Sequence, residues 1–559
     1  MLGGPGSGVG VAIATGSEAG AATGLAAPPP QPGAGASRAQ EAIPKAAIRE
    51  TMRRACYNGN RRSGPRDIAP GALPRVEVVD SRTPMKAPWH GVAATFLAAA
   101  ALSTSCGGAN APSPVQAAAT PTPQAPKPNI VLVLTDDLDV PTNDALPRIA
   151  DLVANRGLSF TRAYLAQPLC GPSRASILTG QYTHNHGVIG NEPPSQGFAA
   201  FRRHEDQTIA TWLKAAGYRT SLVGKYINGY AYGAGDDYVP PGWDDWFGHL
   251  NDTEDGRYWN YWVNDNRSVT RHGSAAEDYS VDVEAKRAVS FIQASAGRPE
   301  PIFLYLAPQS PHLPSNYAAR FGAEFRYSFC PRPPSFNESD VTDKPSWIRQ
   351  IAYLNDAQID EADEMQRWRL RSMRAVEEEV DAVIQALAQT GRLDNTYVFY
   401  TSDNGLLMGQ HRVVARKGNP YEETTRVPLA VRGPGVPTGV VDRPVLNLDL
   451  APTLLDLARA PIPDSVDGRS LAPFLRGQPP ASWRTDVLVE NWGLGPTYAV
   501  RTPDWEYIHN DTEELELYDM NADPWQLQSL HRKVDPSVLA SFEQKLQKLL
   551  ACRGASCRE

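Results

Sequence analysis

The feature that most constrains the fold is the segment 129–135, NIVLVLT, an apolar run of strand length without polar alternation. Such runs are typical of strands buried on both faces of a parallel sheet. Similar apolar runs recur at 220–223, 302–306 and 397–401, with helical patterns between them at 208–216, 282–295 and 367–389. Strands that alternate with helices predict an α/β protein with a doubly wound, mostly parallel sheet. In such sheets, ligands bind beyond the carboxyl ends of the strands.

The pattern changes after residue 480. Short alternating segments follow at 487–489, 498–501, 506–509 and 515–519, and a last helical pattern covers 536–550. Short alternating runs of this kind are typical of antiparallel strands with one face in the core. We therefore predict a main domain over 129–480 and a smaller C-terminal α+β domain, an antiparallel sheet with a helix, over 481–559.

The first 128 residues are rich in Gly, Ala and Pro and show no sustained periodicity, so they cannot bury enough apolar surface to fold. Within them, Met85 and Lys86 precede an apolar run at 91–102, and small residues then lead to Cys106. This arrangement resembles a bacterial lipoprotein signal, in which the cysteine is lipidated. The match is imperfect, because Leu102 lies four residues before the cysteine rather than three.

We interpret 85–106 as this signal, 107–128 as a Pro/Ala-rich linker, and 1–84 as a disordered stretch upstream of a true start at Met85. The protein would then be exported to the periplasm or the cell surface, with Cys106 as the site of a lipid anchor. The alternative is a disordered tail that contains a chance apolar run.

The formal net charge of −8 argues against a nucleic-acid-binding protein. An acidic body does not attract polyanions over a long range, so any anion site must be a local basic pocket. Six cysteines are too few for a disulfide scaffold in a chain of 559 residues. Cys552 and Cys557 are close enough to pair, and free thiols fit the sequence equally well.

Polar side chains follow two of the predicted strands at the point where each strand ends. Asp136 and Asp137 come directly after the first strand, and Asp403 and Asn404 come after the strand at 397–401. Either pair alone would more often form a turn or a helix cap. Because both strand ends point to one edge of the sheet, the four oxygen ligands can converge there on Ca²⁺ or Mg²⁺.

A further motif, Cys170-Gly-Pro-Ser-Arg174, is followed by Leu178-Thr-Gly180. This run resembles the signature of the type I sulfatases. The resemblance implies an alkaline-phosphatase-like fold, Ca²⁺ rather than Mg²⁺, and oxidation of Cys170 to formylglycine by a formylglycine-generating enzyme. Residue 170 would also be a metal ligand. Hydrated to a gem-diol, it would attack sulfur and form a covalent sulfoenzyme. A helix beginning near Ser173 would direct its positive end toward this site.

The resemblance assigns roles to four basic residues. Arg174 would pair with the metal-bound carboxylates and the formylglycine hydroxyl, and Lys225 would neutralise the sulfate. His312 would be the general acid for the leaving alcohol. Lys417 would bridge the sulfate and the ester oxygen. Taken singly, such residues are more often solvated charges or satisfied loop residues.

The chain departs from the family pattern at one point. Many sulfatases carry a histidine two or three residues beyond the first catalytic lysine, where this chain has Ile227 and Asn228. His184 or His186 could accept the formylglycine proton instead, and structural histidines are the alternative. We also expect Asn228 and His411 to be candidates for binding substrate.

The resemblance extends from about residue 128 to Cys557 and is strongest to the N-acetylglucosamine-6-sulfatase and bacterial arylsulfatase branch. The motifs that carry it are Gly224-Lys-Tyr-Ile-Asn228, Phe336-Asn-Glu338, Asp343-Lys-Pro345, Asp394-Asn-Thr396, Glu516-Leu-Tyr-Asp519 and Cys552-x-Gly-x-x-Cys557. It implies sulfate esters of such sugars, or aryl sulfates, as substrates. A phosphodiesterase or phosphonate monoester hydrolase of the same superfamily and a non-catalytic glycan-binding lipoprotein are the alternatives.

Aromatic residues gather at 243–262. They fit either a sugar-stacking wall or, more often, packing in the core or under a lid.

Overall fold

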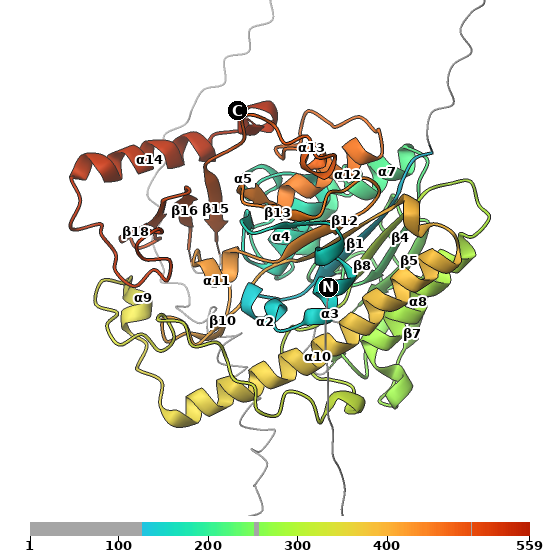
Figure 1. Cartoon of the computed structure of the whole chain (residues 1–559), viewed down its shortest axis with the longest axis horizontal. Coiled ribbons are helices and arrows are strands. Elements are labelled where there is room, and N and C mark those ends of the chain that lie inside the picture. The colour runs from blue at the N-terminus through green and yellow to red at the C-terminus, as the bar shows by residue number, and fades with distance from the viewer. Residues whose placement is uncertain (1–125, 251–255, 493–494, 559) are drawn as a thin grey trace, which may run out of the picture. The chain divides into compact units, whose positions relative to one another are not determined.

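The computed structural model describes residues 126–250, 256–492 and 495–558 (Figure 1). The predicted disordered stretch 1–84, the signal 85–106 with Cys106, and nearly all of the linker 107–128 lie outside the described residues. Among the helices that the structure describes, none combines the length and the apolar character needed to cross a bilayer.

The centre of the fold is a ten-stranded sheet in the order β13-β2-β12-β9-β1-β8-β4-β5-β6-β7. Its strands are β1 (Asn129–Thr135), β2 (Leu158–Phe160), β4 (Arg219–Gly224), β5 (Asp245–His249), β6 (Trp262–Asp265), β7 (Ser268–Arg271), β8 (Ile302–Ala307), β9 (Thr396–Ser402), β12 (Leu429–Arg432) and β13 (Gly439–Val441). The five central strands from β9 to β5 are mutually parallel, and antiparallel pairs flank them on both sides. The prediction of a mostly parallel α/β sheet is confirmed.

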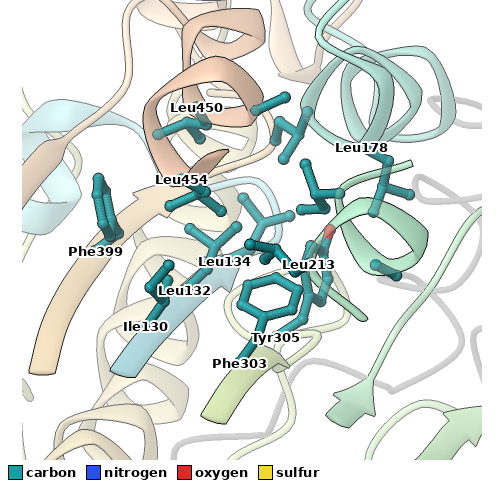
Figure 2. Close-up of a cluster of buried hydrophobic side chains, with 14 of the residues drawn as sticks. Ile130, Leu132, Leu134, Leu178, Leu213, Phe303, Tyr305, Phe399, Leu450 and Leu454 are labelled. Atoms are coloured by element: carbon teal, nitrogen blue, oxygen red, sulfur yellow. The ribbon is translucent and has the colours of Figure 1, made fainter. Parts of the chain in front are cut away.

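Helices cover both faces of this sheet, which explains why β1 is apolar without alternation. Ile130, Leu132 and Leu134 of β1 point to one face, where they join residues of three helices, α4 (Cys170–Thr179), α7 (Ile209–Ala215) and α12 (Leu450–Leu457) (Figure 2). Val131 and Val133 point to the other face, against α8 (Ser280–Ala294) and α10 (Asp356–Gln389). These two helices lie side by side in Figure 1.

The long helix α10 begins at Asp356, eleven positions before the predicted start at 367. Its N-cap is Asn355, whose side chain accepts a hydrogen bond from Gln358 N at 3.0 Å, while the Gln358 side chain accepts one from Asn355 N at 3.1 Å. This reciprocal capping box satisfies backbone donors that a helix start leaves unpaired. The first turns are too polar to show helical periodicity, so the sequence pattern missed them.

Shorter elements connect the sheet and its helices. The helices are α2 (Val140–Asp144), α3 (Pro147–Leu152), α5 (Thr183–His186), α6 (Phe198–Phe201), α9 (Ser346–Arg349), α11 (Glu422–Thr425) and α13 (Ala472–Leu475). The strands are β3 (Ala163–Tyr164) paired with β14 (Val445–Leu446), and β10 (Leu407–Met408) paired with β11 (Val414–Arg416).

The C-terminal region forms a separate antiparallel sheet, as the alternation predicts. Its strands β15 (Val487–Asn491), β16 (Thr497–Arg501), β17 (Trp505–His509) and β18 (Leu515–Asp519) pair in chain order, and α14 (Pro536–Leu550) follows them. This sheet shares a hydrophobic cluster with Tyr164, Tyr421 and Leu446 of the main fold. Cys552 and Cys557 form a disulfide.

The aromatic segment at 243–262 belongs mainly to the core. Trp246 and Tyr261 are fully buried, and the Trp243 ring stacks on Phe303 with a centroid distance of 5.9 Å. Trp262 is 40% exposed on β6. The buried rings favour packing over a sugar-stacking wall.

Substitution of Leu132 by Ala should lower the free energy of unfolding by about 2–5 kcal/mol, because it leaves a cavity between the central strand and α12. Leu132 is fully buried. Urea unfolding followed by circular dichroism measures the change. The matched control is Val440→Ala on edge strand β13, where the side chain is 67% exposed, and we expect a change within about 0.5 kcal/mol. Equal losses in the two variants would contradict this packing.

Candidate active site

Two neighbouring strand ends bring the acidic residues together. β1 and β9 are adjacent and parallel, with Thr135 opposite Ser402, so the residues that follow each strand meet at the same edge of the sheet. Asp403 N donates to Thr135 O at 3.0 Å, and Asp137 N donates to an Asp403 side-chain oxygen at 3.2 Å. Asp136, Asp137, Asp403 and Asn404 are all buried. The structure thus juxtaposes the four predicted metal ligands.

Cys170 is the first residue of α4, so this helix begins three residues before the predicted start near Ser173. Pro172 lies in the first turn, where the missing N–H would have no partner in the helix anyway. The Cys170 Sγ atom lies 3.3 Å from Asp136 Oδ1. Residue 170 therefore stands at the positive end of α4, directly beside the acidic cluster.

Arg174 links the helix to both strand ends. Its Nε donates to Asp403 Oδ2 at 2.8 Å, and its Nη1 donates to the backbone oxygen of Lys225 at 2.9 Å. Its Nη2 is 3.7 Å from Asp136 Oδ2, and the side chain is fully buried. The guanidinium thus compensates two buried carboxylates and fixes their separation.

Two lysines complete the set of cations. Lys225 follows β4 and donates from Nζ to Asp136 Oδ2 at 2.7 Å. Lys417 follows β11; its Nζ contacts Asp137 Oδ1 and lies 2.8 Å from Cys170 Sγ. Burial opposes the ionisation of Asp136, yet the neighbouring cations, led by Lys225, hold its pKa well below the usual value. Asp136 is therefore a stable anion.

His312 lies in the loop after β8, with its Nε2 3.5 Å from Asp137 Oδ2. Its Nδ1 lies 2.7 Å from the backbone oxygen of Leu313, which defines Nδ1 as the donor and leaves Nε2 facing the site. Burial, followed by the charge of Arg257, lowers the pKa of His312 to about 4. The imidazole of this structure is neutral at pH 7.

The donor set fits a divalent cation. Ligand atoms of Asp136, Asp137, Cys170 and His312 all lie within 4.8 Å of one another. The side-chain oxygen of Asn404 is buried and has no hydrogen-bond partner among the described residues, an arrangement that a cation would satisfy. Carboxylate and amide oxygens are the ligands that hard cations prefer.

Comparison with known proteins agrees with this geometry. Residues 128–460 match the sulfatase family, and residues 409–552 match the family described as N-sulphoglucosamine sulphohydrolase, C-terminal. The N-acetylglucosamine-6-sulfatase of Homo sapiens is 35% identical over 481 residues, which cover 77% of this chain and 86% of that protein. The chain belongs to the sulfatase family.

Two solved structures show the same fold as this sulfatase. One of them is a structure in complex with its substrate D-glucosamine-2-N,6-O-disulfate, and its sequence is 25% identical to this chain. The two structures superpose with a TM-score of 0.64, and the match covers 76% of this chain and 97% of that chain. The other is a phosphonate monoester hydrolase from Silicibacter pomeroyi, 23% identical, with a TM-score of 0.59 and coverage of 76% and 94%. The sulfatase is a sulfuric ester hydrolase with the alkaline-phosphatase-like fold.

Asp137 depends on a residue that the sequence did not indicate. Its backbone is in the left-handed region at φ 67°, which is unfavourable for a residue other than glycine. The fully buried Arg369 of α10 donates to Asp137 O at 2.6 Å and to Asp139 Oδ2 at 2.5 Å. Arg369 lies in the charged run 367–371, RWRLR, which is typical of a solvated helix face. Only the fold shows that it supports the site.

The two histidines that follow the signature make their contacts elsewhere. His186 Nε2 lies 3.0 Å from Ser176 Oγ, and its Nδ1 accepts from Val188 N. His184 contacts Glu490 and the backbone oxygen of Cys552, both at 3.0 Å. Ser176 is six residues along α4 from Cys170, about 9 Å at the helical rise. This placement argues against either histidine as the acceptor of a proton from residue 170.

The two remaining candidates lie in different surroundings. His411 is fully buried, with its Nδ1 2.6 Å from Glu338 Oε2 and its ring 4.5 Å from that of Tyr421. These contacts are those of a core residue and argue against direct substrate contact. Asn228 is buried and lines a small cavity beside Lys225.

Substitution of Arg369 by Met should lower the free energy of unfolding by about 3–5 kcal/mol, because it leaves the buried Asp139 carboxylate without its cationic partner. The double variant Arg369→Met/Asp139→Asn should recover part of this loss, since no lone charge is then buried. Both variants should lose turnover, because the Asp137 carbonyl loses its donor.

Urea unfolding and hydrolysis of a nitrophenyl sulfate measure the two effects. Arg320→Met, at a 41% exposed ion pair, is the control and should change stability by less than about 1 kcal/mol. Full turnover in the double variant would show that Arg369 does not hold Asp137.

Proposed function

We propose that this sulfatase cleaves sulfate esters of amino sugars of the N-acetylglucosamine-6-sulfate type, with aryl sulfates also accepted, through a formylglycine made from Cys170. The observation that carries this proposal is the position of residue 170. It stands at the start of α4, 3.3 Å from Asp136 and 2.8 Å from Lys417 Nζ. A nucleophile there faces a group of cations that suits a sulfate.

The unmodified thiol is poorly suited to this role. Burial, followed by the charge of Asp136, raises the pKa of Cys170 well above its usual value, so the thiol stays protonated, and the protonated form is not the nucleophile. A gem-diol at residue 170 supplies two hydroxyls instead. One attacks sulfur and displaces the alcohol. The other then loses its proton while the bond from carbon to the sulfate oxygen breaks, which re-forms the aldehyde, and water restores the gem-diol.

The buried oxygen donors support a bound divalent cation, which we propose is Ca²⁺ held by Asp136, Asp137, Asp403, Asn404 and residue 170. Three carboxylates face three cations, Arg174, Lys225 and Lys417. The neutral His312 adds no charge, so the protein groups sum to zero. Bound Ca²⁺ supplies positive charge that favours the sulfate anion and the ionised nucleophile.

The basic residues divide the remaining work. Lys225 and Lys417 neutralise the sulfate, and Arg174 holds Asp136 and Asp403 in place. His312 is the general acid, with Nε2 facing the site. His312 must be protonated for this role, and the negative charge of a bound sulfate ester favours the imidazolium. The imidazolium then protonates the departing alcohol oxygen.

The names of the similar proteins support the substrate class. The human protein is an N-acetylglucosamine-6-sulfatase, and the solved neighbour holds a glucosamine sulfated at N2 and O6 as its substrate. An extracellular sulfatase homologue of Drosophila melanogaster is 35% identical over 380 residues, which span 34% of that protein. We propose export to the periplasm or the cell surface with a lipid anchor at Cys106, and activation by a formylglycine-generating enzyme.

Substitution of Cys170 by Ala should abolish turnover of nitrophenyl sulfate and of N-acetylglucosamine 6-sulfate and leave the thermal unfolding midpoint nearly unchanged, because a smaller side chain fits this site. Peptide mass spectrometry of the wild type should show the aldehyde, which is lighter than the thiol by the exchange of SH₂ for oxygen. The other free buried cysteine that the structure describes provides the control: Cys330→Ala should keep full turnover.

A thiol at residue 170 in active wild-type protein would contradict the mechanism, as would turnover by Cys170→Ala. Faster hydrolysis of a nitrophenyl phosphate diester than of the sulfate would favour the phosphodiesterase alternative.

Calcium affinity should fall as the pH is lowered through about 6. Burial, followed by Asp136, raises the pKa of Asp403 to about 6, and a carboxyl group must lose its proton before it binds the ion. Below that pH, each ion bound displaces one proton, so affinity should fall by about tenfold per pH unit. Calorimetric titration with Ca²⁺ measures this. Asp403→Asn cannot titrate at this position and should bind more weakly with a flatter pH dependence; an equally flat wild type would contradict the assignment.

A further inference from the structure

Arg416 stands directly before Lys417 and carries a charge that has no carboxylate partner among the described residues. It is the last residue of β11, where it pairs with Leu407 of β10. Its side chain is half-buried and makes neither a hydrogen bond nor an ion pair within the part of the chain that the structure describes. Burial lowers the pKa of Arg416, and no described carboxylate opposes this shift. By contrast, Arg174, Lys225 and Lys417 each contact an aspartate.

The indole ring of Trp347 holds the guanidinium in place. The guanidinium carbon of Arg416 lies 4.8 Å from the centre of this ring. Trp347 belongs to α9 and packs against the hydrophobic cluster of the C-terminal sheet, with its ring 6.4 Å from that of Tyr421. Stacking occupies one face of the guanidinium and leaves the N–H groups in its plane available to a ligand. A half-buried cation without acceptors is unfavourable unless a ligand supplies them.

The segment that carries Arg416 passes beside residue 170. Lys417 Nζ lies 2.8 Å from Cys170 Sγ, and Gly418 N donates to Pro168 O at 2.9 Å. Consecutive Cα atoms are about 3.8 Å apart, so the distance between the cationic groups of Arg416 and Lys417 is limited by the lengths of two side chains. One or two sugar residues can cover such a span.

Two further hydrogen-bond donors belong to the same region. Asn419 Nδ2 and Trp492 Nε1 are buried and have no hydrogen-bond partner among the described residues. The end of β15 adjoins this segment, because a Cβ atom added at Gly418 would lie 3.5 Å from Asn491 Oδ1. Buried N–H groups are normally paired, so unpaired donors here favour a ligand with acceptor oxygens.

We propose that Arg416 binds a second anionic group of the substrate, on the sulfated sugar or on the sugar linked to it. This inference rests on the proposed function and narrows its substrate class. The preferred substrate carries a carboxylate or a second sulfate in addition to the sulfate ester that is cleaved. Both groups present paired oxygens to the planar fork of a guanidinium, and such charge-assisted bonds are roughly twice as strong as neutral ones.

The test compares three substrates in the wild type and in Arg416→Met, with release of the 6-O-sulfate as the readout. N-acetylglucosamine 6-sulfate carries one anion. Glucosamine 2-N,6-O-disulfate adds a sulfate on the same ring, and a disaccharide of a uronic acid and N-acetylglucosamine 6-sulfate adds a carboxylate on the next.

The wild type should cleave at least one of the two doubly anionic substrates with a kcat/KM about tenfold to a hundredfold above that for N-acetylglucosamine 6-sulfate. The substrate that is preferred identifies the source of the second anion. Arg416→Met should lose this preference, mainly through a higher KM, because the second anion does not react.

Arg416→Lys is the second variant. It keeps the charge but lacks the planar fork, so it should retain an intermediate preference. Arg320→Met is the matched control, because Arg320 also stacks on a ring, with its guanidinium carbon 4.5 Å from the centre of Phe321, but it is paired with Asp282 and Glu378. This control should keep the wild-type preference.

Equal kcat/KM values for the three substrates in an active wild type would overturn the inference, as would an undiminished preference in Arg416→Met. An equal fall on all three substrates would also overturn it, since Arg416 would then only support Lys417. If Arg416→Met does not fold, the ratio in Arg416→Lys decides, and an unchanged ratio there counts against the inference. A thiol at residue 170 in the wild type, or no sulfate release from any of the three substrates, would instead refute the proposed function.

Discussion

The site depends on the carboxylate of Asp136, which is fully buried and shared by three partners. Lys225 and Arg174 approach one of its oxygens, at 2.7 and 3.7 Å, and residue 170 lies 3.3 Å from the other. Taking such an ion out of water costs several kcal/mol, and only close pairing offsets this cost. The parallel register of β1 and β9 provides it, because it places Asp403 beside Asp136 and lets one guanidinium serve both. The buried charges are therefore a consequence of the sheet topology.

Asp137, the residue after Asp136, has a strained backbone that a buried arginine holds in place. Asp137 is held in a left-handed conformation that an ordinary side chain avoids, and this conformation accompanies a site in which Lys417, His312 and Asn404 all approach its carboxylate. Arg369 donates a hydrogen bond to the carbonyl of the strained residue. A buried arginine that pairs with Asp139 and also holds a strained backbone gives the site a rigid base, which preorganised electrostatic stabilisation requires.

The parts that the sequence predicts are those determined by local pattern. Apolar runs at 129–135, 302–306 and 397–401 match β1, β8 and β9, and residues just after such strands necessarily meet at one edge. Other parts depend on partners distant in the chain. Arg369 pairs with Asp139, 230 positions earlier, and an arginine that stands between Arg367 and Arg371 gives no sign of burial in the sequence. The sequence analysis places the start of α4 near Ser173, whereas the helix begins at Cys170. A proline such as Pro172 often marks a helix boundary, but it is also compatible with the first turn of a helix.

The histidines show most clearly why spacing alone was insufficient. His184 and His186 lie near the signature in sequence, yet α5 directs them to Glu490 and Ser176. His249 lies 79 positions beyond residue 170 in a segment dominated by aromatic residues, and it comes near the site only because β5 pairs with β4, which ends at Gly224, directly before Lys225. Adjacent parallel strands end at one edge, so a side chain at the tip of β5 is close to the residue after β4 whatever their separation in sequence. The strand order therefore determines which histidine lines the cavity beside Lys225.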